Sequence, residues 1–525
     1  MNKLKTNAPL LIILSGVIFS LYLLSQVPDD LYFSGDGGLK ALLAQQLSSG
    51  NLHFDLNLQV PPWVKTIWNS GLYPFEPPFS YKINNLYYIT FPFTFPLVTS
   101  PFYGIFGYRG FYVVPLISTW LIWLSFYRLC QSFKINQLIT SIGLITLIFA
   151  SPLTMYSAMY WEHTLAVCLA FTGLVVIFSK QENDLNNKEA ILSGILIGLA
   201  VWFRPEFLAL VAILIILIMA SYLTKLDLFT IINNKQIIFS VSLIITVLCF
   251  FALNKMIYNH PLGAHAFQVV ENFSLSERLL KSWKFFNELK DNLLKHFPVI
   301  YFALAICVIS IFRINFRINP VAIQILLISI LFLLIVPILI PSDGGKQWGP
   351  RFLLILIPLV NIIAISGLDK TWEIKQFGIR YISMAILAVL FVWGFNLNII
   401  AGTKTAYQKD KQENVEVLDF LRKDSNKIVA VANQYVGQSF EATFNQKIFF
   451  LTKKPNDVSK LGLALHEQGY TKFLYICPVY DKCFASPQIP NKLRIFASPK
   501  KLTIQLKNIK ENKRYRIEEA TIVQE

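Results

Sequence analysis

The side chains most capable of chemistry are concentrated in five polar loops between apolar segments. The first loop contains Asp36 in the sequence Gly-Asp-Gly-Gly, and the other four combine cations, carboxylates, imidazoles and indoles. Those four are Trp161-Glu162-His163, Arg204-Pro205-Glu206, His260 to His265 and Asp343 to Arg351. A carboxylate can accept a proton from an attacking hydroxyl, and fixed cations can stabilise a departing phosphate. Together these residue types suit the transfer of a group away from a phosphate.

Each of these residues also has a structural interpretation. Aspartate is a common helix N-cap, so Asp36 is either the cap of the following helix or a general base held by a flexible turn. Trp and Arg at helix ends are ordinary membrane-interface anchors, and Gly-Gly and Gly-Pro pairs are ordinary turns. An apolar stripe after Asp36 predicts a helix lying on the membrane surface; it consists of Leu39, Leu42, Leu43 and Leu47.

The chemical interpretation assigns a role to each residue. Asp36 is the predicted general base. Arg204, Lys346 and Arg351 form the predicted phosphate clamp, because cations bind phosphate oxygens strongly. The residues predicted to orient the acceptor or to support the site are Lys40, Glu162, His163, Glu206, His265 and Trp348. No cluster has the spacing of metal ligands, so no cofactor is predicted and the metal requirement stays open.

The composition places these loops at a membrane. Hydrophobic residues make up 54% of the 525-residue chain and charged residues only 15%, with a mean hydropathy of +0.51. An ordinary soluble domain is about 25% charged, so a soluble enzyme is excluded, and the high hydrophobicity excludes disorder. The net charge of +16 favours basic cytoplasmic loops. Because no basic cluster is interleaved with aromatic residues, a nucleic-acid partner is not predicted.

About eleven segments, and at most about thirteen, are long and apolar enough to cross a bilayer. The first, residues 8–28, follows Lys3 and Lys5 and has no small-x-small cleavage motif, so we predict an uncleaved anchor with a cytoplasmic N-terminus. The others are residues 111–127, 135–160, 164–179, 190–203, 207–224, 236–254, 297–312, 318–342, 352–368 and 381–403. None contains Asp, Glu, Lys or Arg, which argues against a transporter with ionisable groups at mid-membrane.

Residues 86–108 decide which side of the membrane the polar loops occupy. The segment is long enough to span but contains Pro92, Pro96 and Pro101, each of which removes a backbone donor. Basic residues leave both orientations open, because nearly equal numbers of them would face the cytoplasm in either case. The prolines favour a segment that stays at the outer surface. In that orientation Asp36, the four other loops and the C-terminal tail all lie outside the cytoplasm.

The composition changes near Lys404 to that of a soluble α/β domain. We therefore predict a membrane domain at residues 1–403, whose first outer loop at 29–110 carries juxtamembrane helices, and a soluble domain on the outer face at 404–525. The predicted helices are 413–422 and 457–468, and the predicted strands are 427–432, 447–451, 472–477, 502–506 and 514–521. Cys477 and Cys483 are compatible with a disulfide in an oxidising compartment, although their spacing does not require one.

At these residues the chain resembles the integral-membrane GT-C glycosyltransferases, the superfamily of the protein O-mannosyltransferases and the lipid A aminoarabinose transferases. The matching features are Gly35-Asp36 in the first loop, the Pro/Gly-rich stretch ending at Gly107, the Arg-Pro-Glu and Gly-Pro-Arg loops, and the soluble C-terminal domain. The resemblance implies a catalytic first-loop acid, a polyprenyl-phosphate sugar donor and inversion at the anomeric carbon. Many members carry two adjacent acids in this loop, whereas here Gly37 and Gly38 follow Asp36.

The sequence therefore predicts a polytopic α-helical membrane protein of GT-C type with a C-terminal soluble α/β domain. Its predicted activity is glycosyl transfer at the outer surface of the cytoplasmic membrane. Its predicted partners are a polyprenyl-phosphate sugar donor, membrane lipid and an envelope acceptor, which is a lipid, a glycan or a protein. A lipid-linked oligosaccharide polymerase or ligase is the alternative function, followed by a flippase or transporter.

Overall fold

The chain divides into two compact units. The computed structural model describes residues 2–180, 185–224, 233–269, 274–312, 319–340, 342, 344–345, 347–373, 377–405, 412–480, 495–497 and 502–524. Met1–Gln26 and Phe111–Lys404 form one unit, here called the helical unit. Val27–Gly110 and Thr405–Glu525 form the other, here called the mixed unit. The first loop and the C-terminal tail, far apart in sequence, therefore share a unit.

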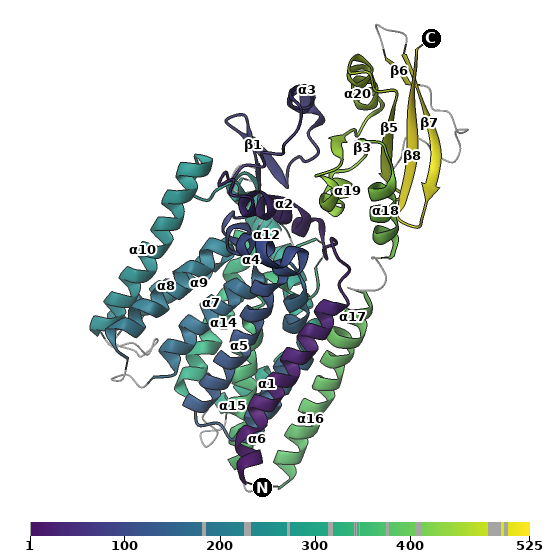
Figure 1. The fold of residues 1–525 in the computed structure, drawn as a ribbon. Helices are drawn as coiled ribbons and strands as arrows, with labels where there is room; N and C mark the ends of the chain where they lie inside the picture. Colours follow the sequence, from purple (N-terminus) through teal and green to yellow (C-terminus); the bar gives the residue numbers. More distant parts are fainter. Residues whose placement is uncertain are drawn as a thin grey trace. The chain divides into compact units, whose positions relative to one another are not determined.

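The helical unit consists of helices (Figure 1). The longer ones are α1 (Asn2–Ser25), α5 (Val113–Ser132), α6 (Gln137–Phe149), α7 (His163–Phe178), α8 (Asn187–Phe203), α9 (Leu208–Thr224), α10 (Asn233–Tyr258), α12 (Leu275–His296), α13 (Val299–Phe312), α14 (Pro320–Leu339), α15 (Leu356–Glu373) and α16 (Phe377–Phe395). Short segments join them: η3 (Pro152–Ala158), η4 (Pro205–Phe207), α11 (His265–Val269), η5 (Arg351–Leu353), η6 (Asn396–Ala401) and α17 (Gly402–Lys404). A helix satisfies its own backbone hydrogen bonds, which a bilayer cannot do.

Among the described residues, six helical stretches are long and apolar enough to cross a membrane, or up to eight if each of two bent pairs counts as one span. The six are Asn7–Ser25, Thr94–Ser132, Pro205–Thr224, Lys235–Tyr258, Pro320–Leu339 and Phe377–Lys404. The bent pairs are Gln137–Phe149 with Pro152–Ala158, at 53°, and Ser276–His296 with Val299–Ser310, at 100°. The polytopic membrane character is thus confirmed, but the expected count of about eleven is not. One reason is that α7, with 16 residues, is shorter than the roughly 20 that a crossing needs.

Small residues allow close packing in the helical unit. A Cβ at Gly194 of α8 would lie 2.6 Å from the carbonyl oxygen of Phe239 in α10, and one at Gly198 would lie 2.7 Å from Cβ of Thr246. Helix backbones approach this closely only where a side chain is absent. These two glycines therefore determine how near α8 and α10 lie to each other.

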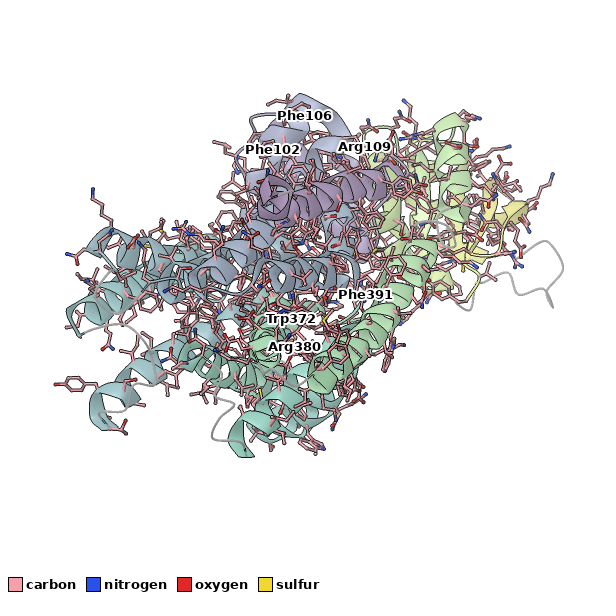
Figure 2. All side chains as sticks on the ribbon, turned by 90° about the horizontal axis from the view of Figure 1, so that it is seen from below. Phe102, Phe106, Arg109, Trp372, Arg380 and Phe391 are labelled. Atoms are coloured by element: carbon pink, nitrogen blue, oxygen red, sulfur yellow. The ribbon has the colours of Figure 1, made fainter. Side chains whose placement is uncertain are left out.

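An aromatic and a basic side chain meet where α15 ends and α16 begins. The guanidinium carbon of Arg380 lies 5.5 Å from the ring centre of Trp372, and Figure 2 shows the two side chains next to each other. Aromatic and basic residues at helix ends are favoured at the boundary between hydrocarbon and water. The pair is therefore a suitable interfacial anchor.

The first-loop part of the mixed unit contains α2 (Gly35–Ser48), α3 (Pro62–Ile67), η1 (Trp68–Leu72), β1 (Ser80–Ile83), β2 (Leu86–Ile89) and α4 (Thr94–Phe106), and it ends within η2 (Gly107–Tyr112). The two strands pair antiparallel. The proline-rich segment 86–108 is consequently a strand followed by a 13-residue helix, not one continuous helix. A helix of that length is about 20 Å long, shorter than the ~30 Å hydrocarbon core. This favours the expectation that the segment does not span, although α4 also begins the longer helical stretch that continues through α5.

The C-terminal part of the mixed unit is built on a six-stranded sheet with the order β4-β3-β5-β8-β7-β6. β3 (Ile428–Val431) is parallel to β4 (Ile448–Leu451) and β5 (Lys472–Pro478), whereas β8 (Tyr515–Gln524), β7 (Leu502–Glu511) and β6 (Ile495–Ala497) are antiparallel additions. The helices are α18 (Gln412–Lys423), α19 (Gln434–Ser439), the short η8 (Glu441–Thr443) and α20 (Pro455–Glu467). The α/β domain is confirmed with each predicted helix and strand, and α19, η8 and β6 are additional.

Candidate active site

The predicted site residues occur in both units. The helical unit contains Glu162, His163, Arg204, Glu206, His265, Trp348 and Arg351, and the mixed unit contains Asp36 and Lys40. Lys346 and Cys483 lie outside the described residues. Cys477, in β5, is disulfide-bonded, and its pairing with Cys483 stays a prediction.

Arg204 is held between two carboxylates in the helical unit. Its Nη1 donates to Glu162 Oε1 at 2.9 Å, and its Nε donates to Glu206 Oε1 at 2.7 Å. Arg204 is 9% exposed, Glu162 0% and Glu206 5%. Burial by itself lowers the pKa of Arg204, but the two carboxylates outweigh burial and raise this pKa above its ordinary value. Arg204 is therefore a fixed, permanent cation, and the two contacts use only two of its five N–H donors.

Arg351 lies among aromatic rings in the same region. It begins η5, and its guanidinium carbon is 5.5 Å from the ring centre of Trp161 and 5.0 Å from that of Phe352. The guanidinium carbon of Arg204 is 5.1 Å from the same Phe352 ring. Both arginines also act electrostatically on the Tyr156 hydroxyl. Two guanidinium groups that share neighbours in this way favour an anion between them, since an anion offsets their repulsion.

His265 adds a neutral imidazole to this cluster. It is the first residue of α11 and follows a turn at Gly263, whose φ of 67° is one that glycine adopts readily. Loss of solvation and, to a lesser extent, the neighbouring charges of Arg204 and Arg278 together lower the pKa of His265 to about 4. The side chain is consequently neutral at physiological pH. It can hydrogen-bond a hydroxyl but adds no positive charge.

His163 and Trp348 contact the same Tyr156. The His163 ring centre lies 5.8 Å from that of Tyr156 and 5.3 Å from that of Trp161. The Tyr156 hydroxyl donates to the carbonyl oxygen of Trp348 at 2.7 Å, and Trp348 Nε1 donates to Asn398 Oδ1 at 3.3 Å. Each predicted residue of the helical unit is thus linked to the others through Tyr156 or Arg204. Tyr156 was missed because a tyrosine within an apolar run has no distinguishing local pattern.

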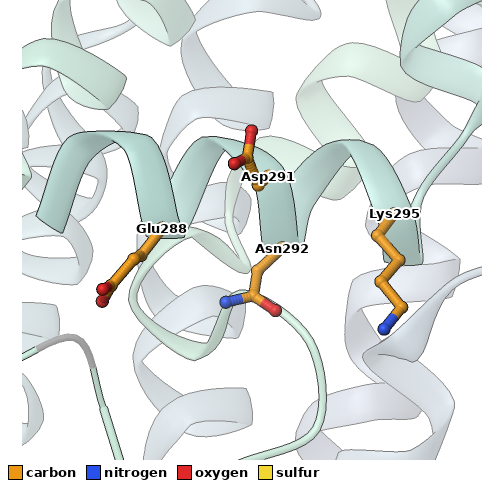
Figure 3. A pocket seen from close by; sticks show the side chains of 4 residues that line it. All are labelled: Glu288, Asp291, Asn292 and Lys295. Carbon is orange, nitrogen blue, oxygen red and sulfur yellow. The ribbon is translucent and has the colours of Figure 1, made fainter. Parts of the chain in front are cut away.

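A separate polar hollow of about 350 Å³ lies along α12. It is lined by Glu288, Asp291, Asn292 and Lys295, from successive turns of the helix (Figure 3). Neither Arg204 nor Arg351 is among its lining residues. This hollow is therefore not part of the proposed phosphate clamp.

Asp36 is the second residue of α2 in the mixed unit and is half-buried. The N-cap is Ser34, whose side chain makes no capping hydrogen bond, so the interpretation of Asp36 as the N-cap is wrong. An acid in the first turn still interacts favourably with the helix dipole. Lys40, one turn later, is 1% exposed and places Nζ 4.3 Å from the centre of the Phe91 ring.

Protein encloses α2 on two sides, which corrects the expected surface-lying helix. The leucines of its apolar stripe are buried, with exposed fractions of 0% for Leu39 and Leu43 and 5% for Leu42 and Leu47. Within the mixed unit α2 packs against α4 and α19. The stripe therefore faces protein and not lipid, because the first loop folds back on its own apolar segment.

Two buried polar residues next to α2 were not predicted from the sequence. Gln438 is 0% exposed and Glu441 is 1% exposed, and Glu441 Oε2 accepts a hydrogen bond from Gln45 Nε2 at 3.3 Å. Burial raises the pKa of Glu441 to about 8. One signal was available, since Glu441 is the only charged residue between Lys427 and Lys447. A lone acid in a long uncharged stretch is a candidate for a buried, perturbed carboxyl.

The fold by itself defines a class of protein. In this class, a polytopic helical membrane unit is joined to a mixed unit that combines the first loop with a C-terminal α/β sheet. The chain is similar to ArnT from Cupriavidus metallidurans bound to undecaprenyl phosphate, with 12% identity, 97% of each chain covered and a TM-score of 0.53. It is also similar to the Archaeoglobus fulgidus oligosaccharyltransferase in complex with Zn and sulfate, with 12% identity, 89% of this chain and 68% of that chain covered, and a TM-score of 0.54.

Both of these proteins are GT-C superfamily membrane glycosyltransferases. The chain therefore has the GT-C fold, as its sequence predicted, and at this identity the likeness establishes the fold alone. No protein-family model matches the sequence, and no curated protein matches it.

Proposed function

We propose that the chain is a glycosyltransferase that moves a sugar from a polyprenyl-phosphate donor to a hydroxyl of an envelope acceptor. One observation carries the proposal: within a GT-C fold, Arg204 and Arg351 share Phe352 and Tyr156 as neighbours, so two cations meet at the ends of apolar helices. The solved ArnT structure contains undecaprenyl phosphate, which supports a lipid-phosphate donor for this chain as well.

The proposed reaction is an inverting displacement. The acceptor hydroxyl oxygen attacks the anomeric carbon, the bond between that carbon and the phosphate oxygen breaks, and its electron pair leaves with the polyprenyl phosphate. Asp36 accepts the hydroxyl proton. Arg204 and Arg351, with Lys346, stabilise the negative charge that grows on the phosphate. His265 and His163 orient the acceptor, and Glu162 and Glu206 keep the Arg204 guanidinium in place.

No cofactor is part of the proposal. Among the described residues, no group of three or more His, Cys, Asp or Glu side chains could hold a metal ion. Whether a divalent ion joins the reaction is decided by assaying transfer with EDTA and then with added Mg²⁺, Mn²⁺ or Zn²⁺.

The test is the isosteric replacement Asp36→Asn in the purified full-length chain. Polyprenyl-phosphate sugars extracted from the host membranes serve as donors, and released polyprenyl phosphate is measured. Loss of a proton acceptor typically costs 10²–10⁴-fold in rate, so a loss of that size is expected. Near-normal turnover would contradict the role of Asp36 and favour a polymerase or ligase that needs no first-loop base. Lipid movement across vesicles without product would favour a flippase.

Location outside the cytoplasm is proposed for Asp36 and the C-terminal tail, with the N-terminus inside. The orientation follows from a first-loop segment that does not span. A reporter active only outside the cytoplasm, fused after Lys411, is expected to be active. Activity of a cytoplasmic reporter at the same position would reverse the proposed sidedness.

A further inference from the structure

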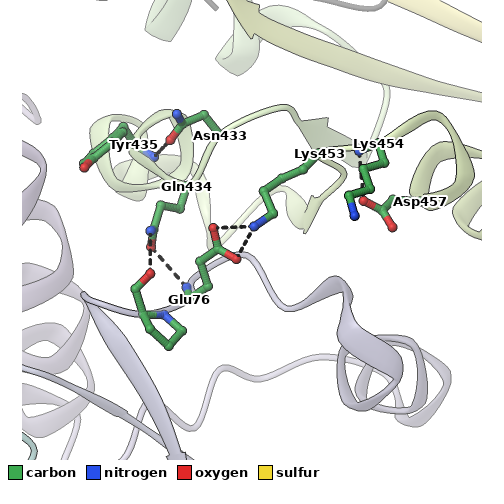
Figure 4. Close-up of polar contacts among 8 residues, drawn as sticks. Glu76, Asn433, Gln434, Tyr435, Lys453, Lys454 and Asp457 are labelled. Carbon is green, nitrogen blue, oxygen red and sulfur yellow. Dashed lines mark hydrogen bonds and ion pairs between the residues drawn. The ribbon is translucent and has the colours of Figure 1, made fainter. Parts of the chain in front are cut away.

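The C-terminal domain holds the first loop at the edge where α/β domains usually bind ligands. Gln434 and Lys453 follow the parallel strands β3 and β4, at their carboxyl ends. Gln434 Oε1 accepts from the backbone N–H of Glu76 at 3.1 Å, and Lys453 Nζ donates to both Glu76 carboxylate oxygens, at 2.9 and 2.6 Å (Figure 4). Carboxyl ends of parallel strands are the common ligand site in such sheets. In this chain, a residue of its own first loop fills that position.

The next element of the domain, α19 followed by η8, reaches the first turn of α2. A Cβ at Gly38 would overlap the backbone oxygen of Gln438 and lie 3.1 Å from Glu441 Cγ. A Cβ at Gly35 would overlap Gln438 Oε1, and one at Gly37 would lie 2.7 Å from Tyr32 Cβ. Each glycine around Asp36 is thus a point of close approach. These contacts explain why glycine stands where many GT-C enzymes have a second acid.

The first turn of α2 has little intrinsic stability. It contains three glycines, which favour helix less than other residues except proline, and its N-cap side chain makes no hydrogen bond. The orientation of Asp36 therefore depends on what packs against this turn. Gln438 and Glu441 provide that packing from the C-terminal domain.

These two residues also carry unused hydrogen-bonding capacity. Neither Gln438 Oε1 nor Nε2 has a hydrogen-bond partner among the described residues, and the same holds for Glu441 Oε1. Leaving such buried groups unpaired is costly, so their presence calls for an explanation. Their close packing on the glycine-rich turn at Gly35 and Gly38 supplies one.

We propose that Gln438 and Glu441 are positioning residues for Asp36, and that the C-terminal domain acts as a clamp on the first turn of α2. The proposal rests on the proposed function, in which Asp36 is the general base. Misplacing a catalytic group by about 1 Å can cost ~10²-fold in rate, so a clamp at this distance from the chemistry affects turnover more than binding.

The packing of Gln438 and Glu441 on the first turn of α2 requires that Glu441 is uncharged. Burial raises the pKa of Glu441 to about 8, Tyr32 and Gln45 oppose this by hydrogen bonding, and the Asp30 carboxylate adds to it. Arg422 acts on Glu441 from α18 but is ion-paired with Asp30, and the Tyr103 hydroxyl approaches from α4. Above pH 8, an ionised Glu441 would be a buried charge beside α2 and would loosen the turn.

The experiment uses the full-length chain and four variants: Gln438→Ala, Glu441→Ala, the isosteric Glu441→Gln, and Gln468→Ala as a matched control. Gln468 is an exposed glutamine of the same domain, at the end of α20. The first measurement is hydrogen exchange at the amides of residues 35–40 without substrate. We expect Gln438→Ala and Glu441→Ala to accelerate exchange about tenfold or more, while Glu441→Gln and Gln468→Ala match the wild type.

The second measurement is release of polyprenyl phosphate from host-extracted polyprenyl-phosphate sugars across pH 6 to 9.5. We expect Gln438→Ala to lower kcat by ~10–10² with less than about threefold change in KM. The wild type should lose activity above pH 8, whereas Glu441→Gln should not, a difference that a merely structural role would not produce. Unchanged hydrogen exchange at residues 35–40 in Gln438→Ala would overturn the proposal that the C-terminal domain positions Asp36. Near-normal turnover in Asp36→Asn would instead overturn the proposed function on which that proposal rests.

Discussion

The two units bury ionisable groups in opposite ways. In the helical unit Arg204 is matched by two carboxylates, at 2.9 and 2.7 Å, and stays charged at every accessible pH. In the mixed unit Glu441 is hydrogen-bonded by the neutral groups of Gln45 and Tyr32 and keeps its proton up to a pH of about 8. The first arrangement is a fixed ion cluster whose charges do not change with pH. The second changes with pH, and it lies next to the proposed base.

The largest expected effect comes from breaking the matched charges. Arg204→Met removes the cation and leaves Glu162 and Glu206 buried without it, which should destabilise the helical unit by about 3–5 kcal/mol. Thermal unfolding of the detergent-purified chain measures the loss. Lys472→Ala is the control, because it removes only an exposed pair with Glu519 and should cost less than about 1 kcal/mol. Similar losses for both variants would mean that the Arg204 cluster contributes no more than a surface pair.

The unmatched acid predicts a pH-dependent stability of the mixed unit. Because the folded pKa of Glu441 is about 8 and its ordinary value is 4.5, the folded state holds a proton that the unfolded chain releases. Stability should therefore fall as pH rises from 4.5 to 8, by at most about 1.4 kcal/mol per unit from this residue.

Glu441→Gln should remove this part of the decline and leave a smaller part from Glu518. The pKa of Glu518 is raised to about 7, chiefly by burial. Unfolding midpoints of both proteins at a series of pH values provide the comparison. Parallel curves for wild type and Glu441→Gln would show that Glu441 is ionised in the folded state.

The close contact at Gly38 predicts an intermediate effect. Gly38→Ala adds a methyl group where the backbone oxygen of Gln438 lies, and overpacking of this kind costs about 1–3 kcal/mol. The control is Gly378→Ala in α16, where nothing lies within 4 Å of the new methyl group and a small stabilisation is expected. Hydrogen exchange in α2 and α19 locates the change. A neutral Gly38→Ala would show that α19 does not pack tightly on α2.

The smallest expected effect on stability comes from removing the ion pair between Glu76 of the first loop and Lys453 of the tail. Glu76 and Lys453 have side chains that are 34% and 50% exposed. A double-mutant cycle with Glu76→Ala and Lys453→Ala should therefore give a coupling of only about 0.2–1 kcal/mol, decreasing at high salt. A coupling above ~2 kcal/mol would mean that this contact, and not the α19 contact with α2, is the main attachment.

Local patterns predicted most elements because each pattern is complete within one segment. Apolar runs such as residues 207–224 and 236–254 are helices in the structure, and short strand-like runs in the tail located β3, β4 and β5 correctly. The number of spans was predicted less well. In the structure α6 and α12 each bend sharply into the next helix, and the hydropathy of a sequence does not reveal such a bend. The sequence also identifies Glu162, Arg204 and Glu206, because they are polar groups at the ends of charge-free segments.

The sequence by itself determined the membrane character, the GT-C type of fold and the polar loops from which a site could be built. The membrane character and the polar loops follow from composition and spacing, which are local, whereas the GT-C type of fold was implied by the resemblance to that family. Only the tertiary structure decided that the first loop shares a unit with the C-terminal domain, that Arg204 is held by Glu162 and Glu206, and that Glu441 is buried beside α2. Gln45 and Glu441 are 396 positions apart and Arg204 and Glu162 are 42 apart, so no local pattern reveals these contacts. In the sequence, Gly37 and Gly38 are only a departure from a family pattern. The structure gives the reason for them, because Tyr32, Gln438 and Glu441 pack where their side chains would be.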